Sequence, residues 1–154
     1  MKFKSSLLAI ALLAGLAAPA VAQDAGGLYI AGPQIELGVA LNQALAANPS
    51  PGRFYLLVLP PAQEALAGPG GAALRQRLAT ARERGGEVLV CRSDIDSRAI
   101  APGSLGSPVT VVRGWPSLEG GLQMIPGTDF YPGDDPAKFP PSHVQMRRLR
   151  SACS

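Results

Sequence analysis

The sequence predicts a three-layer α/β domain with a mainly parallel sheet and a loop-rich C-terminal tail. Short apolar runs alternate with helix-like segments in the order strand, helix, strand, helix, strand, strand, which is typical of this class. The run Phe54–Leu59 is continuously apolar, as expected for a strand covered on both faces. The chain contains 18 glycines and 15 prolines, and they crowd the C-terminal third, which we therefore expect to be rich in loops.

The first half of the chain contains two expected strands and one helix. Leu28–Ile30 is a short apolar run that ends at Gly32-Pro33, and we expect a first strand there. The next segment is predicted to be helical because apolar residues recur at helical spacing before Asn48-Pro49 ends it: Leu37, Leu41, Ala44 and Leu45. The second strand, Phe54–Leu59, stops at Pro60-Pro61.

A second helix and two further strands follow. Leu74, Leu78 and Ala81 mark one face of the helix, and Gly85-Gly86 is a natural stop because glycine accepts the left-handed backbone found at helix ends. The runs Glu87–Cys91 and Val109–Val112 are then predicted to be strands. Cys91 therefore stands at the carboxyl end of an inner strand, where open α/β sheets usually place their ligands.

The tail is expected to end in a short helix. Ser142 and Gln145 form a capping box, after which Val144 and Leu149 would lie on the apolar side. Arg147, Arg148 and Arg150 fall in the last turn, where positive charge favours the helix dipole, and we expect them to be solvated. Before this helix, Tyr131–Pro136 is a turn-rich loop with expected exposed acids, for which a role in partner recognition is conceivable.

Residues 1–22 have the features of a secretory signal peptide. Lys2 and Lys4 precede the apolar run Leu7–Ala18, and Ala20-Val21-Ala22 is a small-x-small cleavage site. The run is shorter than the roughly 20 residues that span a bilayer, so no stable membrane anchor is expected after cleavage. The predicted organisation is a signal peptide (1–22), an α/β domain (23–125) and a Pro/Gly-rich tail with a terminal helix (126–154). The predicted location is periplasmic or secreted.

The charge of the mature chain argues against nucleic-acid binding. Loss of Lys2 and Lys4 reduces the 14 basic residues to 12, against 11 acidic ones, and leaves a formal charge of about +1. A nucleic-acid-binding protein would need a far stronger basic face.

The two cysteines, Cys91 and Cys153, are the main candidates for chemistry. Cys91 is followed by Arg92-Ser93-Asp94, and a helix turn starting near Ser93 or Asp94 would favour a reactive thiolate. A structural disulfide with Cys153 fits an exported protein equally well, because such compartments are oxidising. An inert buried thiol is the third alternative. The sequence leaves these states of Cys91 open.

No metal or cofactor is expected. Asp94 and Asp96 are two acids without a nearby third ligand, and His143 has no His or Cys neighbour in sequence. Gly68–Gly71 lacks the lysine and the Ser/Thr of a phosphate-binding loop and is expected to be a flexible connection. Trp115 would line a cleft or, more commonly for such a residue, pack against the edge of the sheet.

From Phe54 to about Leu122 the chain resembles the DsrE-like sulfur-relay family. The features that carry the resemblance are the strand FYLLVLPP, the helix ending Arg84-Gly85-Gly86, the strand Val88–Cys91, and the later segments Ile95–Ile100 and Val109–Trp115. The resemblance implies a flavodoxin-like domain that often self-associates, with Cys91 at the position that carries sulfur as a persulfide in many members. The export signal and the tail with Cys153 depart from the family pattern.

Two functions are therefore expected from the sequence. In the first, Cys91 is the catalytic residue of an exported sulfur relay and passes sulfur or a thiol to a protein partner. In the alternative, the chain is a non-catalytic periplasmic binding or interaction module with a structural Cys91–Cys153 disulfide. Whether the protein is an enzyme stays open at this point.

Overall fold

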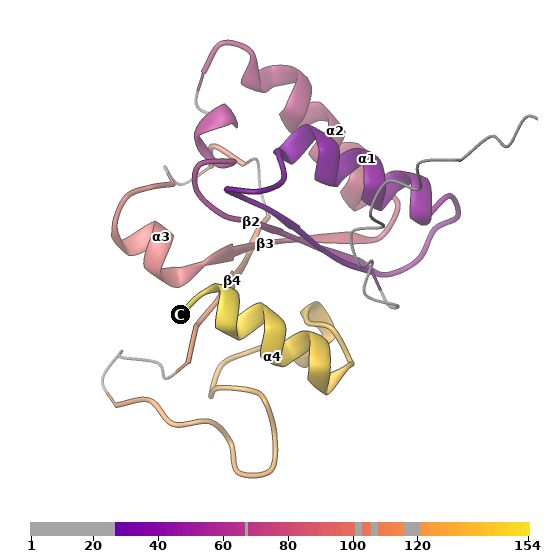
Figure 1. The fold of residues 1–154 in the computed structure, drawn as a ribbon. Coiled ribbons are helices and arrows are strands. Elements are labelled where there is room, and N and C mark those ends of the chain that lie inside the picture. The colour runs from indigo at the N-terminus through magenta and orange to yellow at the C-terminus, as the bar shows by residue number, and fades with distance from the viewer. Residues whose placement is uncertain (1–26, 67, 101–102, 106–107, 116–120) are drawn as a thin grey trace, which may run out of the picture.

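The computed structural model describes residues 27–66, 68–100, 103–105, 108–115 and 121–154. The predicted signal peptide lies outside these residues. A four-stranded parallel sheet forms the middle layer, with strands β1 (Leu28–Ala31), β2 (Phe54–Val58), β3 (Gly86–Cys91) and β4 (Thr110–Val112). Helices α1 (Leu37–Ala47) and α2 (Gly71–Glu83) cover one face, and α4 (His143–Ala152) covers the other (Figure 1). The predicted three-layer, flavodoxin-like α/β domain with a parallel sheet is confirmed.

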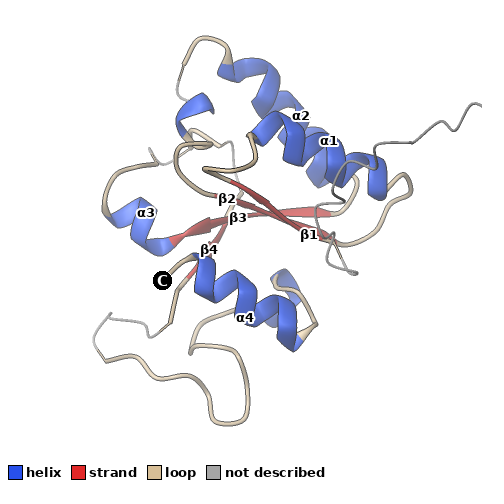
Figure 2. Ribbon diagram, viewed as in Figure 1, coloured by secondary structure: helices blue, strands red, loops and turns tan. Residues whose placement is uncertain are grey.

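The strands lie in the order β1-β2-β3-β4, so each strand pairs in parallel with the next one in sequence. Figure 2 shows the sheet between the α1–α2 layer and α4. In open α/β sheets, ligands bind where the strand order reverses. No reversal occurs among the described strands, so these strands form no switch-point crevice.

Consecutive βα units build the α1–α2 face. The helices direct an aliphatic stripe onto one side of the strands, and the buried cluster there includes Leu41, Leu56, Leu78, Val88 and Val90. Helix α2 ends at its cap residue Arg84, and Gly85 follows with φ +98°. A side chain at Gly85 would also overlap the carbonyl oxygen of Gly52, so the predicted glycine stop is confirmed.

Helix α4 covers the opposite face and joins a second buried cluster with strand residues such as Tyr55, Leu57 and Leu89. The Ser142 half of its predicted capping box is confirmed, because the Ser142 hydroxyl accepts a hydrogen bond from the Gln145 amide at 3.5 Å. The other half is not formed, and the buried Gln145 Nε2 has no hydrogen-bond partner among the described residues. The predicted apolar side was only partly right. Leu149 is buried, but Val144 is 71% exposed and Met146 packs inward instead, because the buried side of α4 also carries Gln145 and Arg150.

Two charged residues of the tail are buried, contrary to expectation. Arg150 is 0% exposed although we predicted a solvated helix end, and the Asp134 side chain is 2% exposed although we predicted exposed acids in this loop. The cause is a direct ion pair, with 2.6 Å between Arg150 Nη2 and Asp134 Oδ2. The tail thus supplies one layer of the fold through α4.

Candidate functional site

Cys91 is the last residue of β3, and the short helix α3 (Arg92–Asp96) begins directly after it. The helix turn expected near Ser93 or Asp94 therefore starts slightly earlier in the chain. The side chain of Cys91 belongs to the cluster on the α4 face, and the residue is only 1% exposed. Cys91 thus lies at the end of a strand, as predicted, but its side chain belongs to the buried face of the sheet that α4 covers.

Cys91 is bonded to Cys153 in a disulfide, with the two Cα atoms 5.2 Å apart, a usual separation for such a bridge. Cys153 is the C-cap residue of α4 and is 6% exposed. The bridge joins an inner strand to the end of the covering helix. Of the three states of Cys91 that the sequence left open, the structure contains the disulfide.

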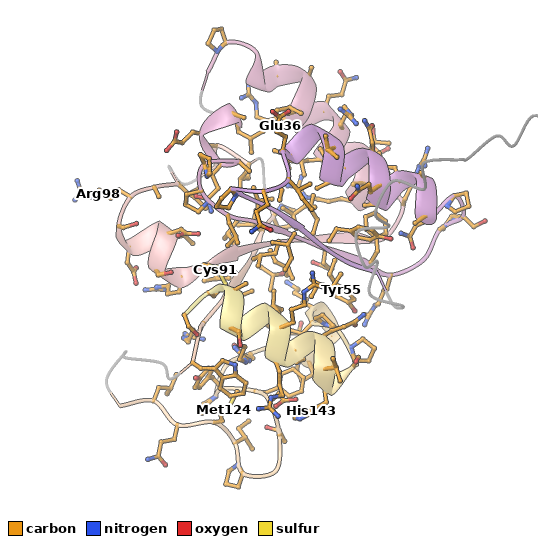
Figure 3. All side chains as sticks on the ribbon, viewed as in Figure 1. Glu36, Tyr55, Cys91, Arg98, Met124 and His143 are labelled. Atoms are coloured by element: carbon orange, nitrogen blue, oxygen red, sulfur yellow. A yellow bond between two sulfur atoms is a disulfide. The ribbon has the colours of Figure 1, made fainter. Side chains whose placement is uncertain are left out.

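Arg92 and His143, two groups that could activate a Cys91 thiolate, have other partners. Arg92 Nε forms an ion pair with Asp96 Oδ1 at 3.0 Å along α3. His143 contacts Asp129 at the opposite end of α4 from Cys153. A helix of this length spans about 15 Å at 1.5 Å per residue, and Figure 3 shows Cys91 and His143 near its two ends. The structure therefore does not bring a histidine to Cys91.

The segment after β4 is hydrogen-bonded to the end of α4. The Trp115 amide donates to Ser154 Oγ at 2.7 Å, and its indole Nε1 donates to the Arg147 carbonyl at 3.4 Å. A Cβ atom at Gly114 would overlap the Cys153 carbonyl, so the two segments need glycine here to approach. Trp115 thus packs on the tail helix next to the bridge.

Arg150 forms a second attachment beside the disulfide. Its guanidinium donates to the Arg113 and Asp129 carbonyl oxygens, each at 2.8 Å, and pairs with Asp134. The group also lies 4.7 Å from the centre of the Tyr131 ring, a cation–π distance. These hydrogen bonds and the ion pair offset the cost of removing the Arg150 charge from water. They also link α4 to the end of β4 and to the tail loop.

A smaller polar group lies at the carboxyl edge of the sheet. Gln63 Nε2 donates to the Val58 carbonyl at 2.7 Å and to Asp94 Oδ2 at 2.8 Å. Burial raises the pKa of Asp94, and the hydrogen bond from Gln63 opposes that rise. Asp96 is paired with Arg92, and among the described residues no group of three or more His, Cys, Asp or Glu could hold a metal ion. Asp94 therefore links α3 to the segment that follows β2, whereas Asp96 pairs within α3.

A recess of about 330 Å³ lies at the β1 edge of the sheet, between the α1 side and the α4 side. Residues of β1 and Leu59 line it. Gln34 and Gln43 stand on the α1 side, and Arg148 stands on the α4 side. We call this the edge recess. Its volume is at the lower end of the range for small-molecule pockets.

Comparison with known proteins identifies no matching family model, no similar curated protein and no similar solved structure. The resemblance to DsrE-like proteins therefore stays a prediction from the sequence. In the part of the chain that the structure covers, no helix has the length and apolar character needed to cross a bilayer.

The edge recess and the Gln63–Asp94 contact could not be predicted from local sequence patterns. The recess residues come from β1, from the segment around α1 and from α4, and no local pattern connects them. The recess lies at the β1 edge, and β1 is an edge strand only because of the strand order, which no short segment encodes. Gln63 carried one weak signal, since a polar residue just after the Pro60-Pro61 strand stop lies at the carboxyl edge of a parallel sheet.

Proposed function

We propose that the chain is an exported, non-catalytic binding or interaction module, with the Cys91–Cys153 disulfide as a structural bridge. One observation carries this proposal: the sulfur atom expected to act as a nucleophile is bonded to Cys153, in a residue buried beneath α4. A cysteine acts as a nucleophile when it is a reachable thiolate. A bridge between two packed elements instead limits the freedom of the unfolded chain and so stabilises the fold.

The surroundings of the bridge support the same function. Leu89, Val112, Met146 and Leu149 share its buried cluster, and an apolar environment disfavours a thiolate. Periplasmic or extracellular location also fits, because disulfides persist in oxidising compartments. The predicted signal peptide would deliver the chain there. The edge recess, which Cys91 does not line, offers a place for a ligand or partner.

The thiol state of the mature protein, purified from the periplasm, tests the proposal. We expect native alkylation to label neither cysteine, and labelling of both only after unfolding with reductant. Mass spectrometry of the peptides would locate the bridge. Rapid native alkylation of Cys91, or Cys91 recovered with an additional sulfur atom, would overturn the proposal.

Sulfur relay is the second candidate, favoured by the position of Cys91 at the carboxyl end of β3 and by the resemblance to DsrE-like proteins. This function requires prior reduction of the bridge to two thiols by a dithiol. The Cys91 thiolate would then attack a sulfane sulfur of inorganic polysulfide, and the shortened polysulfide would leave. Persulfide formation on the reduced protein, abolished by Cys91→Ala but not by Cys153→Ala, would favour the relay over the module.

A further inference from the structure

The walls of the edge recess are mainly apolar. Strand β1, the loop before α1 and the residue after β2 supply them, namely Leu28, Tyr29, Ile30, Pro33, Ile35 and Leu59. Leu28 and Tyr29 are only 3% and 9% exposed, so these walls are packed into the protein and do not project from it. An apolar lining of this kind favours a ligand with an apolar body, because both surfaces leave water when they meet.

The recess extends along β1, between the α1 and α4 layers (Figure 2). Leu28 lines one end, and Gly32 and Leu59 lie together at the other, since a Cβ atom at Gly32 would be 3.2 Å from the Leu59 Cβ atom. Gly32 follows Leu28 by four residues, about 13 Å of extended chain. The recess volume of about 330 Å³ is roughly twice that of a ~150 Å³ cavity that holds benzene. A linear aliphatic body therefore fits these dimensions better than a single ring does.

The polar groups available in the recess are uncharged amides. Gln34 and the half-buried Gln43 line it from the α1 side, and their side chains have no hydrogen-bond partner among the described residues. Arg148 is the only charged residue among the described residues of the lining, and it is already engaged in an interaction. A charged ligand would lose hydration here without gaining an ion pair. An uncharged group with a donor and an acceptor can instead bond to a glutamine amide.

We infer that the edge recess binds a small neutral molecule with a linear aliphatic body and one amide or hydroxyl group. The body lies along the apolar walls, and the polar group bonds to Gln43. The inference rests on the proposed function as a binding module and names the class of its ligand. Ligand pockets commonly combine apolar walls with a few polar groups that fix the orientation of the ligand.

The probes are hexanamide and octanamide, with octanoate and octylammonium as charged analogues of the same chain length. Binding is measured on the oxidised mature protein at neutral pH, from the backbone amide NMR signals of Leu28–Ile30 and Leu59. We expect octanamide to bind about tenfold more tightly than either charged analogue, because a charged group has no partner available in the recess. Octanamide should also bind about tenfold more tightly than hexanamide, since two further methylene groups are buried.

Gln43→Glu tests where the polar group binds. It places a carboxylate of nearly the same size at that position, so octylammonium should bind about tenfold more tightly to this variant than to the unaltered protein. Gln76→Glu is the matched control, because Gln76 is exposed on α2 and does not line the recess. It should leave every affinity unchanged. An equal response to both variants would show that net charge determines binding and would overturn the inference.

Ile30→Trp tests where the aliphatic body binds. The indole occupies part of the recess, so octanamide affinity should fall at least about tenfold. Val39→Trp adds the same side chain at a 45% exposed position of α1 outside the recess and should retain binding. If Ile30→Trp fails to fold, Gln34→Trp at an exposed position of the lining gives the same comparison.

Two further results would overturn the inference. One is a charged analogue that binds the unaltered protein as tightly as octanamide does. The other is octanamide binding that leaves the Leu28–Ile30 and Leu59 signals in place, which would contradict the edge recess as the site and leave the binding module intact. Failure of the proposed function looks different, because a free, reactive Cys91 would contradict the module without changing the order of the ligand affinities.

Discussion

The two faces of the sheet differ in how their helices are held. On one face, α1 and α2 pack mainly through aliphatic side chains, and each helix directly connects the strands that it covers. On the other face, α4 comes from the distant end of the chain and is attached by the Cys91–Cys153 bridge and by buried Arg150. A helix that directly connects the strands it covers needs little beyond its apolar stripe to stay packed on them. A helix that closes a long loop needs specific attachments to offset the entropy of closure.

Removal of the disulfide should show the difference between the two faces most clearly. The bridge spans 62 residues, so the chain-entropy model predicts a loss of roughly 4 kcal/mol in the free energy of unfolding for the Cys91→Ala/Cys153→Ala double variant. Urea unfolding measures the loss. Native hydrogen exchange should show reduced protection in α4 and unchanged protection in α1 and α2. Equal loss of protection on both faces would contradict the comparison.

Arg150→Ala should have the next largest effect. It leaves Asp134 buried without its nearest cation, and breaking such a pair costs about 3–5 kcal/mol. Arg113, whose Nη1 lies 3.4 Å from Asp134 Oδ1, places the expected loss near the lower end of that range. Thermal or urea unfolding gives the value, with exposed Arg147→Ala as the control. A loss as small as that of the control would show that the buried pair contributes little to holding α4.

Coupling across the sheet provides a finer comparison. Leu149 shares a buried cluster with the bridge, whereas Leu41 lies in the cluster on the opposite face. In double-mutant cycles with the cysteine-free variant, Leu149→Ala should show a coupling energy of about 1 kcal/mol. Leu41→Ala should be additive to within about 0.5 kcal/mol, as expected for residues without a shared partner. Similar couplings for both leucines would mean that the faces do not behave independently.

The smallest effect concerns the pH dependence of Asp94. Its pKa is raised in the folded protein, mainly by burial, so the folded state binds the proton more tightly than the unfolded state does. Stability from this residue is therefore present below the ordinary aspartate pKa of 3.8 and declines as the pH rises through the folded-state pKa. Asp94→Asn should remove this part of the decline. Parallel stability–pH curves for the two proteins over that interval would contradict the assignment.

The α1–α2 face could be predicted from the sequence because its signals are local. The periodicity of Leu37, Leu41 and Ala44 identified α1, and the continuous apolar run Phe54–Leu59 identified a strand buried on both faces. Gly85 ended α2 as expected. In each case the residues that form the element also carry its pattern, and tertiary packing did not alter the outcome.

The α4 face and the candidate sites were harder to predict because they depend on residues far apart in sequence. Arg150 has the local pattern of a solvated helix end, and only its pairing with Asp134 across a loop makes burial favourable. Met146 takes the buried place expected for Val144 because the buried charge sets the rotation of α4. The state of Cys91 depended on where the chain end lies, and the edge recess depended on the strand order. Neither is encoded in a short segment.

The order of the strands also has a consequence for biosynthesis. Strands β1, β2 and β3 are synthesised before α4. Their residues Tyr55, Leu57 and Leu89 therefore exist in the nascent chain before the helix that covers them has been made. Translation at about 5–20 residues per second needs roughly 2–8 s for the stretch from Arg113 to Ala152. A sheet formed before α4 would expose a continuous apolar surface, and exposed apolar surface of this kind favours aggregation. Aggregation during expression should therefore respond to translation speed in this late stretch more than to speed in the early helices.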